Sequence, residues 1–132
     1  AGVCYPLALE AALKIKEVSY IHAEGFAAAE LKHGVISLIE KDTPCVVLVP
    51  PGGKAARMRV SADELKARGA RLIGVGPEDE VFDNSLPISA TSDLSYSLSA
   101  IVPLQLLAYE LALVRKLDPD KPRTLAKSVT VR

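Results

Sequence analysis

Residues 45–76, CVVLVPPGGKAARMRVSADELKARGARLIGVG, decide the fold class. Two short apolar runs, 45–50 and 71–76, flank a polar segment that favours a helix ending near Gly69. A short continuous apolar run is typical of a strand that is buried on both faces. Because two such strands joined by a helix usually lie parallel in one sheet, the stretch predicts an α/β fold.

The flanking residues add further helices and one strand to this unit. Strong helix formers cover 7–20 after Pro6, and a second helical stretch is expected over 22–33, with Gly34 as its stop. After the second strand the sequence predicts, in order, a loop over 77–84, a strand over 86–90, a long helix over 93–116 that Pro103 kinks or divides, and an irregular segment from 118. This alternation predicts a parallel sheet with helices on both faces.

Composition narrows the classes of function. The chain has 132 residues, one domain's worth, and its 16 basic residues balance 16 acidic ones, so we expect no nucleic-acid partner. Cys4 and Cys45 belong to no metal-binding or disulfide pattern, and no metal is expected. We also expect no membrane partner and a cytoplasmic location, because no apolar run has the length of a membrane span and no signal peptide is recognisable.

The chain opens on AGVCYP (1–6), directly at a helix start, whereas a fold of this kind normally begins with a buried strand. Residues 1–3 resemble the end of a strand and its turn. We therefore expect a piece of a longer protein that lacks its first strand.

Glu10, Lys14 and Glu17 follow one another at spacings of four and three residues, and therefore share one face of the first helix. Apolar residues cover most of the remaining surface, which predicts a largely buried helix. In one interpretation Glu10 and Lys14 form a solvated ion pair and Glu17 is also exposed to water. In the other the three residues form a polar line in a cleft, where a carboxylate beside a lysine serves as a proton-transfer base.

Two further residues allow two interpretations each. His33 stands at a predicted helix end, where it is either a capping cation or an acid/base group. Lys127 lies in an apolar terminal stretch, where it is either an exposed edge-strand lysine or a desolvated amine with a lowered pKa.

Three long motifs resemble one enzyme family. They are YPLALEAALKIKEVSYIHAEGFAAAELKHG (5–34), VPLQLLAYELAL (102–113) and DKPRTLAKSVTV (120–131). In this order they resemble the glutamine:fructose-6-phosphate aminotransferases, also called glucosamine-6-phosphate synthases, in the second of the two sugar-isomerase (SIS) modules of their isomerase region. The resemblance implies one flavodoxin-like, three-layer α/β/α SIS module over 1–132, with 118–132 as a C-terminal tail that acts as a lid.

The resemblance also implies roles for the polar line of the first helix. Glu17, in KIKE, matches the carboxylate that moves a proton between C1 and C2 of the open-chain sugar phosphate. Lys14 matches a lysine near the substrate hydroxyls, and Glu10 matches the supporting acid of the same helix face. The resemblance makes both of them substrate-binding candidates. Because a base beside an acidified C–H suffices for this step, no cofactor is expected.

The remaining implied site residues lie elsewhere in the chain. His33, in ELKHG, matches a histidine that opens the sugar ring and reaches the site of a neighbouring subunit. Lys127, in LAKSV, matches a lysine that engages the keto sugar and can form a Schiff base, and Ala126 beside it is a substrate-binding candidate. Family members pair their isomerase regions, which implies a homodimer.

The implied reaction converts fructose 6-phosphate and ammonia from glutamine to glucosamine 6-phosphate, through ring opening, imine formation and C1–C2 proton transfer. The glutaminase domain and the first SIS module of the family have no counterpart in these residues, so the chain is expected to carry half of an isomerase site. Two alternatives remain open. One is a stand-alone SIS-type glucosamine-6-phosphate deaminase or isomerase, and the other is a non-catalytic SIS domain that senses a sugar phosphate.

Overall fold

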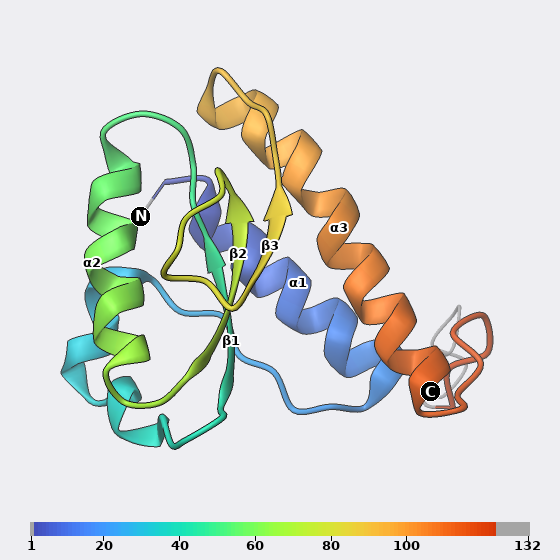
Figure 1. The fold of residues 1–132 in the computed structure, drawn as a ribbon. Coiled ribbons are helices and arrows are strands. Elements are labelled where there is room, and N and C mark those ends of the chain that lie inside the picture. Colours follow the sequence, from blue (N-terminus) through green and yellow to red (C-terminus); the bar gives the residue numbers. More distant parts are fainter. Residues whose placement is uncertain (1, 124–132) are drawn as a thin grey trace, which may run out of the picture.

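The computed structural model describes residues 2–123. Its helices cover both faces of a parallel sheet (Figure 1). The elements are, in chain order, α1 (Cys4–Ser19), the 3-10 helices η1 (Ala28–His33) and η2 (Val35–Leu38), β1 (Pro44–Leu48), α2 (Lys54–Lys66), β2 (Arg71–Gly76), β3 (Asn84–Pro87) and α3 (Asp93–Val114). The predicted α/β class is confirmed.

The sheet has the strand order β1-β2-β3, and both pairings are parallel. β2 has the predicted bounds, whereas the prediction for β3, 86–90, is wrong at both ends. The backbone N–H of Asp83 donates to the carbonyl oxygen of Leu72 at 2.9 Å, and Asn84 pairs with Ile73. β3 therefore begins at polar residues, before the apolar residues from which the strand was predicted.

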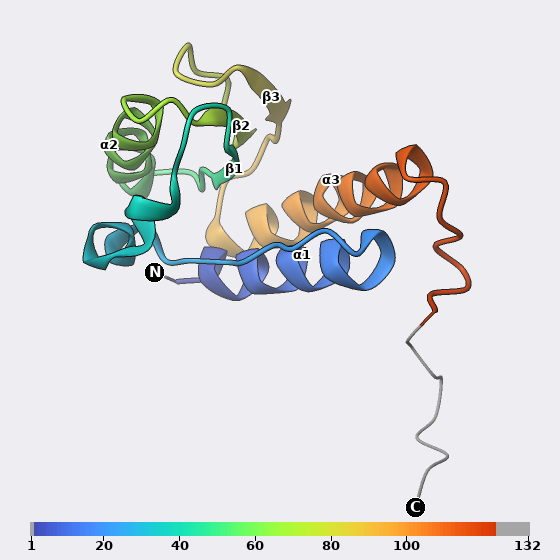
Figure 2. The ribbon, with the colours of Figure 1, turned by 90° about the horizontal axis from the view of Figure 1, so that it is seen from below.

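Strand side chains alternate between two cores, which makes the molecule three-layered (Figures 1 and 2). Val47 and Val49 pack with α2 on one face of the sheet. Leu48 and Val75 pack with α1 and α3 on the other face. Such alternation is expected of strands that are covered on both sides.

α1 and α3 lie side by side and run in the same direction (Figures 1 and 2). Ser92 caps the start of α3, where its hydroxyl accepts a bond from the N–H of Ser95 at 3.2 Å. The buried face of α3 repeats every four residues, at Tyr96, Ala100, Leu104, Ala108 and Ala112. α3 continues as one helix through Pro103, and Ser99, whose carbonyl loses its helical partner there, is exposed to water.

The predicted second helix, 22–33, is wrong for its first half. α1 ends when Tyr20 adopts a left-handed backbone with φ of 56°, and residues 20–27 then run back along α1 in an extended form (Figure 2). A Cβ atom on Gly25 would lie 2.7 Å from the carbonyl carbon of Ala8. Gly25 therefore permits a close approach of two backbones, and only η1 is helical.

α3 is also long and apolar enough to cross a membrane by length and composition, with a mean hydropathy of 1.6, which the sequence interpretation did not anticipate. Core helices of globular domains pass the same test. One side of α3 is packed against α1 and the sheet, yet only 22% of its most apolar window is buried.

Candidate functional site

The polar line of α1 exists as a three-residue ion cluster. The Lys14 Nζ donates to the Glu17 Oε2 at 2.8 Å and lies 3.7 Å from the Glu10 Oε1. The Glu17 side chain is the most sheltered of the three, with 24% of its area exposed. The helical spacing of four and three residues thus brings both carboxylates to one ammonium.

The cluster lies at the margin of the buried face of α1. Leu7, Ala11 and Ala12 are buried, whereas Leu9 and Leu13 are 44% and 41% exposed. The prediction of a largely buried α1 is therefore wrong for one side of the helix. The cluster separates the two sides, and its partly exposed polar groups are open to a ligand.

The ion pair favours the charged form of Lys14. The hydrogen bond to Glu17, followed by the charges of Glu17 and Glu10, raises the pKa of Lys14 above its ordinary value. The lysine is therefore an ammonium at neutral pH and not a nucleophile. It can orient a carboxylate or bind a hydroxyl, and Glu17 is the group that can accept a proton.

The structure does not bring His33 to this cluster within one chain. His33 is exposed at the end of η1, on the α2 side of the sheet, whereas Glu17 lies in the last turn of α1 (Figure 2). Lys32 beside it forms an ion pair of 2.7 Å with Glu64 on α2, which anchors η1 there. Lys127 and Ala126 lie outside the described residues.

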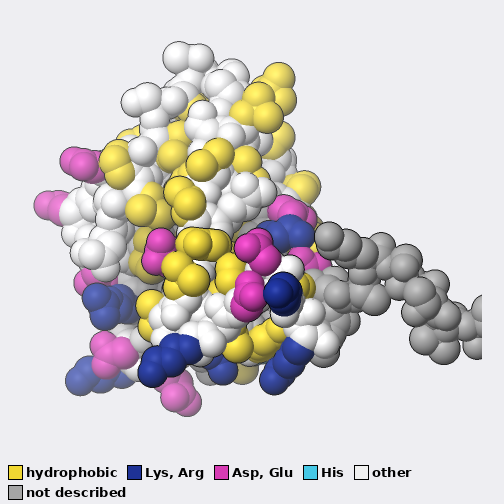
Figure 3. Space-filling model, turned by 90° about the vertical axis from the view of Figure 1, so that its right-hand side faces the viewer, with side chains coloured by type: hydrophobic (Ala, Val, Ile, Leu, Met, Phe, Trp, Pro, Cys, Tyr) yellow, Lys and Arg dark blue, Asp and Glu magenta, His cyan; other side chains and the backbone are white. Residues whose placement is uncertain are grey.

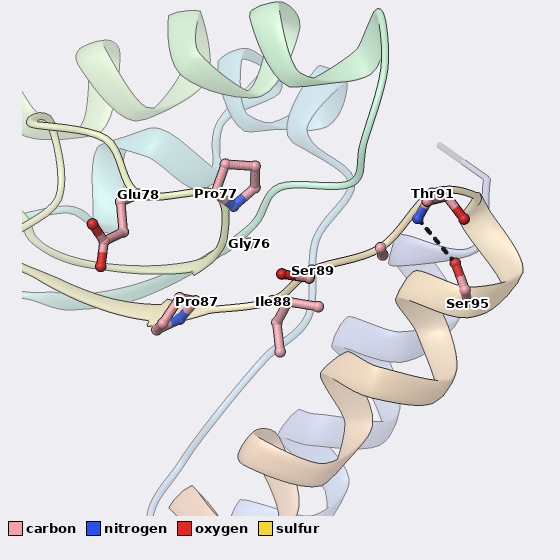
Figure 4. Close-up of a pocket in the computed structure, with 9 residues that line it drawn as sticks. Gly76, Pro77, Glu78, Pro87, Ile88, Ser89, Thr91 and Ser95 are labelled. Atoms are coloured by element: carbon pink, nitrogen blue, oxygen red, sulfur yellow. Dashed lines mark hydrogen bonds between the residues drawn. The ribbon is translucent and has the colours of Figure 1, made fainter.

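A pocket of about 720 Å³ opens at the carboxyl edge of the sheet. Figure 4 shows the residues that line it, which come from the end of β2, the end of β3 and the start of α3: Gly76, Pro77, Glu78, Pro87, Ile88, Ser89, Ala90, Thr91 and Ser95. Gly76 has φ of 145°, and a Cβ atom there would lie 2.4 Å from the carbonyl oxygen of Val49. Only glycine fits at this corner of the pocket.

Sequence reasoning did not find this pocket. The predicted parallel sheet was itself a signal, because proteins with such sheets commonly bind ligands at the carboxyl ends of the strands. The pocket holds none of the predicted site residues. The hydroxyl of Ser95 is used locally, since it accepts bonds from the N–H of Thr91 at 3.3 Å (Figure 4) and from that of Ser92 at 3.1 Å. We therefore assign the candidate chemistry to the α1 cluster. No group of three or more potential metal ligands occurs within residues 2–123.

Comparison with known proteins agrees with this fold. The family model of the SIS domain matches residues 1–115. The glutamine–fructose-6-phosphate aminotransferase (isomerizing) of Gloeobacter violaceus is 51% identical over 98% of this chain. The chain spans 22% of the length of that protein.

Two solved structures share the fold and part of the sequence. The C-terminal domain of the glucosamine-fructose-6-phosphate aminotransferase of Francisella tularensis superimposes with a TM-score of 0.79 and 36% identity, over 86% of this chain and 34% of that one. The glucosamine-6-phosphate deaminase of Thermotoga maritima gives a TM-score of 0.76 and 31% identity, over 95% of this chain and 37% of that one. Because the SIS domain model matches residues 1–115 of the 132 in this chain, the chain belongs to the SIS domain family.

Proposed function

We propose that this chain is the C-terminal isomerase module of a glutamine–fructose-6-phosphate aminotransferase, which forms glucosamine 6-phosphate from fructose 6-phosphate and ammonia. The observation that carries the proposal is the 51% identity to such an enzyme across 98% of the chain. The Lys14–Glu17 pair supports it, because the reaction needs a positioned carboxylate base.

In this reaction Glu17 takes the proton from C1 of the fructosimine and returns it to C2, while the hydroxyl proton of O1 moves to the imine nitrogen, and together these transfers give the aldose amine. The ammonium of Lys14 holds the Glu17 carboxylate in one orientation through their 2.8 Å contact. Glu10, whose Oε1 lies 3.7 Å from the same ammonium, binds the sugar substrate. The sugar C–H is acidified by the adjacent imine, so the step requires only proton transfer.

The other roles belong to the assembled protein. His33 opens the sugar ring in the site of a neighbouring subunit, which fits its exposed position away from Glu17 of its own chain. Lys127 engages the ketose carbonyl, where a Schiff base retains the sugar, and Ala126 contacts the substrate beside it. These assignments rest on the resemblance of the ELKHG and LAKSV motifs.

The test is made on the full-length protein that carries this chain. Fructose 6-phosphate and ammonia are supplied, and both glucosamine 6-phosphate formation and deuterium uptake from heavy water at the sugar carbons are followed. The Glu17→Gln variant is expected to lose about 10²–10⁴-fold in both rates while sugar binding persists, because a positioned base contributes that factor.

The matched control is Glu24→Gln, since Glu24 is a half-exposed carboxylate whose ion-pair partner within residues 2–123 is His22, at 3.4 Å. This variant should keep the wild-type rate. Equal rates for the Glu17→Gln variant and the wild-type protein would reject Glu17 as the base. Absence of product from the wild-type protein would reject the aminotransferase.

A second candidate is a SIS-type glucosamine-6-phosphate deaminase or isomerase. It is favoured by the similarity to the deaminase of T. maritima, which covers 95% of this chain. Such an enzyme would release ammonia from glucosamine 6-phosphate and would not consume glutamine. A non-catalytic sensor would bind the sugar phosphate without deuterium uptake, and its affinity would not depend on Glu17.

We further propose that the full-length protein is a cytoplasmic homodimer in which the exposed side of α3 packs on a second copy. Leu94, Leu98, Val102 and Leu106 are each more than half exposed on this helix. A surface this apolar is typically covered by protein. We expect neither a nucleic acid nor a membrane at this face, because the helix is capped and packed as part of the α/β fold.

A further inference from the structure

The last turn of α1 carries the proposed base, Glu17, and it ends in an unfavourable backbone conformation. Tyr20, the residue after the helix, has a left-handed backbone with φ of 56°. A residue with a side chain is strained there, and such a conformation persists only where its surroundings hold it. The N–H of Tyr20 donates to the carbonyl oxygen of Lys16 at 3.2 Å, so the turn that Tyr20 closes also contains Glu17. The position of the base therefore depends on contacts that keep this turn closed.

One of these contacts comes from the end of α3. The Arg115 Nη1 donates to the carbonyl oxygen of Ser19, the last residue of α1, at 2.8 Å. The last four carbonyls of a helix have no partner within the helix itself. A cation at this place also interacts favourably with the negative end of the helix dipole. Arg115 therefore caps α1, although it is distant from Ser19 in the sequence.

Arg115 is itself held in place by a closed helix end. The N–H of Lys116 donates to the carbonyl oxygen of Leu113 at 2.8 Å, and that of Leu117 donates to the carbonyl oxygen of Ala112 at 2.9 Å. With Lys116 in the left-handed region at φ of 58°, these two bonds form a Schellman motif. Figures 1 and 2 show the ends of α1 and α3 side by side. The guanidinium therefore reaches the end of α1 from a fixed backbone next to it.

Two further contacts support the same turn. The Ser19 side chain is buried, and its hydroxyl donates to the carbonyl oxygen of Ile15 at 2.6 Å. The hydroxyl of Tyr20 accepts the backbone N–H of Arg123 at 2.7 Å, and the guanidinium carbon of Arg123 lies 4.1 Å from the centroid of the Tyr20 ring. These contacts hold the side chains of Ser19 and Tyr20, whereas Arg115 holds the main chain at the end of α1 from another helix.

We propose that Arg115 is a positioning residue, which holds the last turn of α1 in its helical form and thereby keeps Glu17 in position as the base. Arg115 acts through the main chain of α1, and it needs no contact with the sugar. The inference rests on the proposed function for its effect on the rate, whereas the capping of α1 is independent of that function. A catalytic group that is displaced by about 1 Å can lose about 10²-fold in rate, so even a small relaxation of the turn should be measurable.

The first experiment tests the cap without activity. Backbone hydrogen exchange of residues 16–21 is followed by mass spectrometry in the full-length protein, for wild type, Arg115→Leu and Arg115→Lys. Because Arg115 is exposed, both variants should fold. Exchange in this segment is expected to be about tenfold faster in Arg115→Leu, since the end of α1 opens more often, and intermediate in Arg115→Lys, which keeps the charge and one donor group. Unchanged exchange in Arg115→Leu would overturn the cap.

Arg68 provides a matched control. Its Nη1 donates to the carbonyl oxygen of Glu64 at 3.1 Å, near the end of α2 on the opposite side of the sheet. Arg68→Leu removes the same kind of bond, and it should leave exchange in residues 16–21 at the wild-type rate. Equal acceleration of residues 16–21 in Arg68→Leu and Arg115→Leu would show a general loosening of the fold and would also overturn the cap.

The second experiment tests positioning. For fructose 6-phosphate, the kcat of Arg115→Leu should fall about tenfold while KM stays within about twofold of wild type, and Arg115→Lys should restore part of the kcat. Arg68→Leu should keep both wild-type values. In a Glu17→Gln background, Arg115→Leu should have no further effect, because it acts through Glu17.

Several kinetic results would reject the positioning role. A wild-type kcat in Arg115→Leu despite faster exchange would show a merely structural contact, and so would an equal loss of kcat in the Glu17→Gln background. A raised KM at unchanged kcat would show an effect on binding instead. Inactivity of the wild-type protein would reject the proposed function, and with it the positioning role, and would leave the exchange result standing.

Discussion

At the scale of single residues, Tyr96 connects three elements of the core. Its side chain is 1% exposed, and its hydroxyl donates to the carbonyl oxygen of Val75 at 2.7 Å. The same carbonyl accepts the N–H of Val49 at 2.9 Å. Burial raises the pKa of Tyr96, so the phenol stays neutral and remains a donor. The Val75 carbonyl in β2 therefore binds both α3, through Tyr96, and the residue that follows β1, Val49.

Tyr96→Phe is expected to lower the free energy of unfolding by about 1 kcal/mol, measured by urea denaturation. The loss is small because the Val75 carbonyl keeps its bond from Val49 and the phenyl ring keeps its packing. Tyr109→Phe, at a position 45% exposed, should leave the free energy unchanged. A cost above about 3 kcal/mol would mean that the carbonyl is left unsatisfied and that the Val49 bond breaks as well.

At the scale of elements, continuous apolar runs and helix-capping residues predicted the elements whose position depends on neighbouring residues in the sequence. β2 matches its apolar run, and Ser92 begins α3 where the sequence places the helix. Residues 22–27 could not be predicted in this way, because their path depends on Gly25 meeting the backbone of α1. The Lys14 cluster followed from helical spacing, whereas the pocket at Gly76 combines strand ends that are distant in sequence.

The charged side chain of Asp83 links α2 to β2. Its carboxylate accepts a bond from Lys66 at the end of α2 and from the N–H of Leu72 in β2, the latter at 2.7 Å. The bond from Lys66, followed by that from Leu72, lowers the pKa of Asp83 below its ordinary value. The folded protein therefore binds this proton less readily than the unfolded chain does, and the interaction stabilises the fold fully only above the ordinary pKa.

Acid should accordingly weaken the protein through Asp83. We expect Asp83→Asn to be less stable than wild type at pH 7, and the difference should shrink as the pH falls below about 3.9 and through the lower pKa of the folded state. Urea denaturation at a series of pH values measures this. The exposed Asp42→Asn serves as the control. A difference that is independent of pH would show that the packing of Asp83, and not its charge, is what matters.

At the scale of the whole molecule, one side of α3 lacks a cover within the described residues. Six large apolar residues follow each other on this side at spacings of three or four, and they are Leu94, Leu98, Val102, Leu106, Tyr109 and Leu113. The stripe is about 29 Å long at 1.5 Å per residue. Figure 3 looks onto this side and shows hydrophobic side chains over much of it, with charged side chains toward its lower end.

A continuous apolar stripe is self-complementary, so two copies related by a two-fold axis can bury it against itself by ridge-into-groove packing. We therefore expect Leu98→Glu, at a position 68% exposed, to turn a dimer of the full-length protein into a monomer without unfolding it. Light scattering after size exclusion gives the mass, and a dissociation constant raised about 100-fold or more is expected, because the new carboxylate would be buried without a partner. Val60→Glu, at a position 56% exposed on α2, makes the same change on the opposite layer and should leave the dimer intact. If Leu98→Glu keeps the dimer, a second copy does not cover this stripe. If it keeps the mass but lowers the Tm, another segment of the same protein covers it.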